Sequence, residues 1–266
     1  TVLNLHLLVS ANARGLFFAY VWWTELLMII NSLERIDHPD FNDVVIHFTG
    51  RSGPSLRSPE VASLSDWGRL QQIITSSHFI GHEMFGVNAK AVCFTEGTAT
   101  GCSWLVGQGR YTSCGIAFSK RYLFEIGGGP VLQIRGDEWA QVSMWPESSR
   151  ARAVRLWPGA TAEEGEVLPW WMEGRSEWMF EREWRVPAPS PTVGFSITEV
   201  AFLVVPSFGD LKSWVSELSI INAALSKVIA SMRYVVIGPS GIIESNGVRP
   251  RAASTLLKAP ERNPYS

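Results

Sequence analysis

Short apolar runs alternate with polar loops along the chain, and these runs predict the main strands. Residues 42–50 (NDVVIHFTG) hold four apolar residues before a closing glycine, and residues 90–96 (KAVCFTE) and 200–206 (VAFLVVP) are of the same kind. Residues 177–187 (EWMFEREWRVP) alternate aromatic and charged residues. Runs of this length, rich in β-branched and aromatic residues and bounded by turn residues, are typical of strands.

Helical periodicity appears in three other segments. Residues 67–79 carry apolar residues at 67, 70, 73 and 74, and Asp66 is the expected N-cap. Residues 210–232 and 16–34 have apolar positions at similar spacing. Each of these segments is predicted to be helical.

The order of these elements predicts an α+β fold. Further short strands are expected at 114–118, 131–134 and 234–241. The early strands follow one another without long crossover helices, which favours an α+β domain over a doubly wound parallel sheet. No G-x-G-x-x-G run opens a helix after a strand, so a Rossmann dinucleotide site is not expected.

The length of 266 residues fits one large domain with decorated ends. We predict an N-terminal helical extension over 1–41, one domain over 42–241 and a flexible tail over 242–266, which is rich in polar residues, arginine and proline. Residues 15–30 are apolar but fall short of the roughly 20 residues that a membrane span needs. Two interpretations of the start stay open: a buried or amphipathic helix, or a natural start at Met28 preceded by an extension of 27 residues.

Composition narrows the possible partners and the compartment. The formal net charge of −2 gives no broad nucleic-acid footprint and no polybasic membrane patch. Three cysteines without a tight pair argue against a disulfide framework and favour a reducing, cytoplasmic setting. His78 and His82 have metal-ligand spacing, but Gly81 interrupts the helix and no third ligand has matching spacing, so no metal site is predicted.

Several polar residues within or beside the predicted strands are candidates for chemistry. His47 and Thr49 share one face of the first strand because side chains alternate along a strand. Buried polar groups need partners, which either the core or a ligand supplies. Glu96, Tyr111 and Ser113 lie at strand ends, where hydroxyls in particular are common for turn geometry alone.

The sharpest signal is the pair Glu181 and Glu183, two residues apart in a predicted strand. Side chains at this spacing lie roughly 7 Å apart on one face. Two carboxylates so placed repel unless they are solvated or paired. Either they form an exposed face in which Arg185 pairs with Glu183, or they belong to a site where positive charge develops.

Four segments in this order resemble a bacterial family with an ADP-ribosyltransferase-like fold, members of which occur near phage-defence and toxin–antitoxin genes. They lie within residues 44–206 and read HFTG, KAVCFTE, YTSCGIAFSKRYLFEIGGGPV and FEREWRVP. The resemblance implies a split antiparallel β core with surrounding helices and a cleft that holds NAD as substrate. The serine-threonine-serine triplet usual in such enzymes is only partly matched, by YTS at 111–113.

The resemblance also implies roles for individual residues. His47, with Thr49 beside it, matches the first-strand position that binds the adenosine-side ribose and amide of NAD. Tyr111 and Ser113 are the candidates for support on the nicotinamide side. Glu183 matches the second glutamate of an E-x-E pattern, which contacts the nicotinamide ribose, and Glu181 matches the first.

The chemistry of NAD cleavage gives such a glutamate pair a purpose. Breaking the nicotinamide–ribose bond leaves an oxocarbenium-like sugar, which a fixed carboxylate stabilises. A second carboxylate can orient or deprotonate the acceptor. The expectation is an NAD-dependent ADP-ribosyltransferase-like toxin or defence effector that acts on an unidentified protein or nucleic-acid acceptor, has a cognate antitoxin or toxin as partner, and involves no membrane. The alternatives are an NAD hydrolase on the same scaffold and a non-catalytic antitoxin or ligand-binding module.

Overall fold

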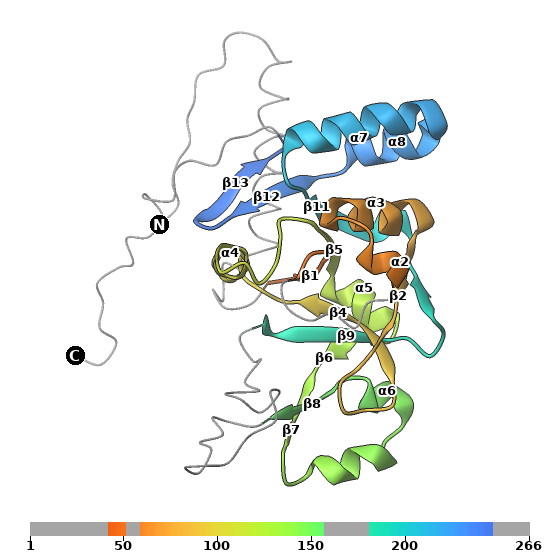
Figure 1. Ribbon diagram of the computed structural model, residues 1–266, viewed down its shortest axis with the longest axis vertical. Helices are drawn as coiled ribbons and strands as arrows, with labels where there is room; N and C mark the ends of the chain where they lie inside the picture. Colours follow the sequence, from red (N-terminus) through yellow and green to blue (C-terminus); the bar gives the residue numbers. More distant parts are fainter. Residues whose placement is uncertain (1–41, 52–58, 157–180, 247–266) are drawn as a thin grey trace, which may run out of the picture.

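The computed structural model describes residues 42–51, 59–156 and 181–246 (Figure 1). Its strands are β1 (Val44–Phe48), β2 (His78–Ile80), β3 (His82–Glu83), β4 (Lys90–Thr95), β5 (Gly115–Ser119), β6 (Gly129–Pro130), β7 (Leu132–Arg135), β8 (Ala153–Leu156), β9 (Glu183–Pro187), β10 (Thr192–Gly194), β11 (Val200–Val204), β12 (Tyr234–Gly238) and β13 (Gly241–Ser245). Its α-helices are α2 (Pro59–Ala62), α3 (Asp66–Ser76), α4 (Ala99–Gly107), α5 (Lys120–Glu125), α6 (Glu147–Arg150), α7 (Phe208–Ile221) and α8 (Ala223–Ser231). Two 3₁₀ turns cover Trp139–Met144 and Ile197–Glu199.

A nine-stranded mixed sheet organises the fold, which is α+β as predicted. The strand order is β13-β12-β11-β5-β1-β4-β9-β6, with β3 paired to β4 at the side. Only β11 and β12 run parallel within this sheet, and its other neighbours are antiparallel. The described residues also form two smaller sheets, β10-β2 and β7-β8.

The sheet is buried on both faces because its strands carry apolar residues at odd and even positions alike. Val45 of β1 belongs to a core cluster that also contains Leu70 of α3 and Trp214 of α7. Ile46, its neighbour, belongs to a second cluster with Leu105 of α4. Figure 1 shows α4 and α3 on opposite sides of the central strands. Burial on two faces explains why these strands read as continuous apolar runs.

The sheet loosens in its middle, between β1 and β4. Strand β1 forms five register pairs with β5, and β4 forms five with β9. Between β1 and β4 the register holds a single pair, Ile46 opposite Thr95. The two strands therefore separate beyond this point, next to the residues that the sequence marks as candidates for chemistry.

Most predicted elements within the described residues are present, but several begin or end at residues other than those predicted. The helix expected over 67–79 ends at Ser76 because Ser77 takes a left-handed conformation, with φ of 54°, and residues 78–80 form β2. Ser65, rather than Asp66, caps that helix, with its hydroxyl accepting the N–H of Gly68 at 3.0 Å. Strand β13 continues to residue 245, past the boundary predicted at 241.

Other predictions lie partly or wholly outside the described residues. The expected extension over 1–41, with its helix over 16–34, lies outside them, as does the tail from residue 247.

All three cysteines are free. None of the helices in the described segments is both long and apolar enough to cross a membrane.

Candidate functional site

Glu183 opens β9 and is held by the arginine two residues further along the strand. Arg185 donates to both carboxylate oxygens of Glu183, from Nε to Oε1 at 2.9 Å and from Nη2 to Oε2 at 3.2 Å. Its Nη1 donates to the carbonyl oxygens of Ala151 and Ala153, at 3.2 and 2.9 Å. The two side chains share a strand face, and both are largely buried: Glu183 is 14% exposed and Arg185 11%. The pairing of Glu183 with Arg185 is confirmed, but the face is not an exposed one.

The thiol of Cys93 lies beside this ion pair. Cys93 of β4 is directly opposite Arg185 in the register and therefore shares its face. Burial raises the pKa of the thiol, and the Glu183 carboxylate raises it further, so the thiol is protonated at neutral pH. The Cys93 Sγ also lies 3.8 Å from Sδ of Met84. For Arg185, burial lowers the pKa, but Glu183 and Cys93 together offset this and leave the pKa above its ordinary value.

Glu181 lies just before β9 and is the more buried of the two glutamates. Arg110 donates to its Oε1 from Nε at 2.8 Å and from Nη2 at 2.5 Å, and the Tyr111 hydroxyl donates to its Oε2 at 2.9 Å. The Thr95 hydroxyl donates to the Tyr111 oxygen at 3.4 Å. The Tyr111 ring stacks on Phe48 of β1, with centroids 4.6 Å apart. Burial raises the pKa of Tyr111, and Glu181 adds to the rise, so the phenol remains a donor.

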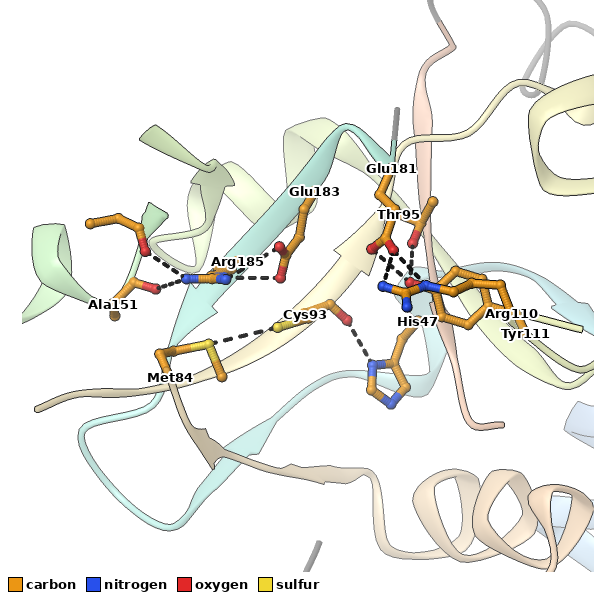
Figure 2. A network of polar contacts seen from close by, with 11 residues as sticks. His47, Met84, Cys93, Thr95, Arg110, Tyr111, Ala151, Glu181, Glu183 and Arg185 are labelled. Carbon is orange, nitrogen blue, oxygen red and sulfur yellow. Dashed lines mark hydrogen bonds and ion pairs between the residues drawn. The ribbon is translucent and has the colours of Figure 1, made fainter. Parts of the chain in front are cut away.

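The prediction that both glutamates stand on one strand is wrong for Glu181. Arg182, between them, has φ of 45° in the left-handed region, and β9 begins only at Glu183. Such a conformation is uncommon for a residue that is not glycine, asparagine or aspartate. Figure 2 nevertheless shows the two carboxylates projecting from the chain in the same direction, with Thr95 and Cys93 nearby. The carboxylates share one side of the sheet because of a turn at Arg182 rather than a regular strand.

His47 does not join the glutamates. Because Ile46 pairs with Thr95, those two share the glutamate face, and His47, the next residue of β1, points to the other face. The imidazole packs against Phe79 and Phe94, with ring centroids 4.9 and 5.7 Å away. Its Nδ1 lies 2.8 Å from the carbonyl oxygen of Cys93 and donates to it. His47 therefore bridges β1 and β4 where their own ladder stops.

Thr49 and Ser113 also serve the fold in this structure. The Thr49 hydroxyl donates to the carbonyl oxygens of Asp66 and Cys114, at 2.8 and 3.2 Å. The Ser113 hydroxyl donates to the carbonyl of Val205 at 3.1 Å and accepts the N–H of Ile237 at 3.1 Å, which ties the ends of β11 and β12 together. Of the six predicted site residues, the structure brings together Glu181, Glu183 and Tyr111 and leaves the other three apart from them.

Two charged residues near the glutamates were missed in the sequence, one bound to Glu181 and one on the opposite face of the sheet. Arg110 lies 71 positions before Glu181, and nothing in its local pattern distinguishes it from a loop arginine. Glu96, noted only as a strand-end residue, is 5% exposed and binds two cationic side chains. The segment CFTEG placed Glu96 at the end of β4, next to Thr95, and that adjacency was the available signal.

The arrangement is a set of acidic and basic side chains held in fixed directions on one side of the sheet. Each glutamate is oriented by an arginine through two hydrogen bonds, so neither carboxylate can turn away without breaking them. Charge-assisted bonds of this kind are short and stronger than neutral ones. A rigid negative group of this sort can stabilise a neighbouring cation without reorganisation. The described residues contain no group of three or more histidine, cysteine, aspartate or glutamate side chains that could hold a metal ion.

Comparison with known proteins adds no constraint to this interpretation. No protein-family profile, curated protein or solved structure matches the chain.

Proposed function

We propose that the chain is an NAD-dependent ADP-ribosyltransferase-like enzyme that cleaves the nicotinamide–ribose bond, with Glu183 as the carboxylate that faces the ribose. The observation that carries the proposal is the pair of buried, arginine-oriented carboxylates, Glu181 and Glu183, on one side of the sheet. They lie next to the point where β1 and β4 separate. A split β core is what the resemblance of the sequence to the ADP-ribosyltransferase-like family implies.

The chemistry of the bond supports the assignment of Glu183. Departure of nicotinamide leaves positive charge on the ribose, and a carboxylate fixed before the reaction lowers the energy of that charge. Arg185 fixes the direction of the Glu183 carboxylate through two hydrogen bonds. The side chain of Glu183 is 14% exposed, against 5% for Glu181, so Glu183 has more surface to offer a substrate.

Glu181 has a supporting role in this proposal. It is the more buried of the two glutamates, and its oxygens accept from Arg110 and Tyr111. It therefore orients the Tyr111 hydroxyl and forms an ion pair with Arg110. His47 holds β1 to β4 through the Cys93 carbonyl, and its expected contact with NAD is not part of the proposal.

The test is incubation of the purified chain with NAD, followed by chromatographic measurement of free nicotinamide. We expect release from the wild type and none from Glu183→Gln. NAD labelled in the adenine moiety separates the possible fates of ADP-ribose. Label on a protein or nucleic acid indicates a transferase, free ADP-ribose indicates the hydrolase alternative, and intact NAD with the wild type would refute the catalytic proposal in favour of a binding module.

We propose further that this activity is that of a toxin or defence effector. Induced expression in a bacterial host is then expected to arrest growth and deplete NAD or modify a macromolecule, whereas Glu183→Gln at equal expression is expected to be harmless. Equal growth of the two strains would argue against the toxin role while leaving NAD cleavage to be decided by the purified protein.

A further inference from the structure

A second polar cluster lies on the opposite face of β4 and β9 from the glutamate pair. Its centre is Glu96, the residue directly after β4, which is 5% exposed. Glu96 Oε1 accepts from Arg182 Nη2 at 2.7 Å and from Lys120 Nζ at 2.6 Å. Its Oε2 accepts the indole N–H of Trp184 at 2.7 Å. The Lys120 ammonium also lies 5.8 Å from the centroid of the Trp184 ring.

These contacts hold both neighbours of Glu183. Arg182 precedes it and Trp184 follows it, and the carboxylate of Glu96 binds each of them. The backbone N–H of Glu96 also donates to the carbonyl oxygen of Arg182 at 3.2 Å. Side chains alternate along a strand, so holding Trp184 on one face directs its strand neighbour Glu183 to the other.

The same contacts maintain an unfavourable backbone conformation. Arg182 has φ of 45°, an unfavourable conformation for a residue other than glycine that persists only when its surroundings enforce it. Glu96 holds this residue at two points, through its side chain and through its backbone carbonyl. The turn at Arg182 is what brings Glu181 to the same side of the sheet as Glu183.

We infer that Glu96 is a positioning residue for the glutamate pair: from the opposite face of the sheet, it fixes the turn at Arg182 and thereby the direction of Glu181 and Glu183. The inference rests on the proposed NAD cleavage for its kinetic consequence but not for its structural one. Glu96 contacts no part of the glutamate face, so its loss is expected to affect turnover rather than NAD binding.

The test is Glu96→Gln, which keeps the shape and removes the charge that two cations share. Glu83→Gln is the matched control. Glu83 lies on β3, next to β4, and forms an ion pair with Lys90 at 3.7 Å, which the substitution removes. This pair involves neither Arg182 nor Trp184. We expect kcat for nicotinamide release to fall about 100-fold in Glu96→Gln, the scale of a displacement near 1 Å, with KM for NAD within about twofold of wild type. The control is expected to match wild type.

Unchanged kcat in a folded Glu96→Gln protein would overturn the inference, as would a rise in KM with kcat preserved. If that variant does not fold, Arg182→Gln decides in its place, since it removes the guanidinium from Glu96 at a partly exposed side chain. A kcat equal to wild type there would refute the positioning role.

A structural arm separates this inference from the proposed function. If the wild type releases no nicotinamide, the proposed function fails, and a crystal structure of Glu96→Gln still tests the positioning role. We expect residues 181–183 to change conformation and Glu183 to leave Arg185. An unchanged Glu183–Arg185 pair in that structure would overturn the inference independently of any activity.

Discussion

Replacing Glu183 by glutamine separates the structural contribution of this carboxylate from its proposed chemical one. The change keeps the shape of the side chain and removes its charge. Arg185 then loses its counterion in a place where its side chain is 11% exposed. Removing one partner of a buried ion pair costs about 3–5 kcal/mol, because the other charge is left buried without compensation.

Two features of the structure reduce that cost. Arg185 keeps the carbonyl oxygens of Ala151 and Ala153 as acceptors, and the amide oxygen of glutamine can accept one of the two bonds that the carboxylate accepted. The one bond that the glutamine oxygen retains is worth about 1.5–3 kcal/mol, which leaves a net loss of about 2 kcal/mol. For a domain of this size, such a loss lowers the melting temperature by about 4–8 °C.

Urea denaturation followed by tryptophan fluorescence measures the loss directly, and nicotinamide release is measured on the same preparations. Glu125→Gln is the control, since Glu125 pairs with Arg121 on the surface of α5 and such pairs contribute little. A Glu183→Gln protein that unfolds at the wild-type urea concentration would refute the buried-pair reasoning. One that folds and still releases nicotinamide at the wild-type rate would refute the catalytic assignment. Glu181→Gln is expected to slow release less than Glu183→Gln does.

Three further predictions concern residues outside the glutamate pair. His47→Ala is expected to lose about 1–3 kcal/mol of stability, because the Cys93 carbonyl loses its donor, and to keep its NAD affinity, as a melting curve beside calorimetric titration would show. Ser113→Ala is expected to lose a similar amount of stability without any change in kcat or KM, since the hydroxyl only ties β11 to β12. A change in kcat or KM would instead show that Ser113 belongs to the functional site. Burial raises the pKa of Cys114 to about 12, so above pH 9 the unfolded chain loses this proton while the folded chain keeps it, and stability falls as pH rises. Cys114→Ala is therefore expected to make urea midpoints between pH 9 and 10.5 fall less steeply than those of wild type.

Local patterns were sufficient to predict the longer strands of the central sheet, β1, β4, β5, β9, β11 and β12, but not β3, β6 or β13. The runs at β1 and β4 are short, apolar and bounded by polar residues, so their strand character follows from the chain itself. The amphipathic spacing of α3 was equally clear, although the left-handed Ser77 that ends it was not. The residue at which a helix or strand ends can depend on one left-handed residue such as Ser77, a conformation that most residue types adopt only when their neighbours enforce it.

The composition of the site depended on register, which the sequence does not reveal. Which face of the sheet holds Glu183 is decided by the pairing of β1 with β4 at Ile46 and Thr95. A shift of one residue in that pairing would bring His47 to the glutamate face. The pairing of Glu181 with Arg110 likewise joins positions 71 residues apart.

The burial of the two ion pairs bears on whether the glutamates serve structure or function. A buried ion pair is weak evidence for stability, because apolar side chains of similar volume in its place are often neutral or stabilising. Stability alone therefore does not account for the burial of Glu181 and Glu183 with their arginines. An exposed charged face, the simpler interpretation of E-x-E, is also excluded, since both glutamate side chains are at most 14% exposed. Fixed charge in a poorly solvated place acts strongly on a neighbouring ion, and this physical argument favours a site where a cation forms.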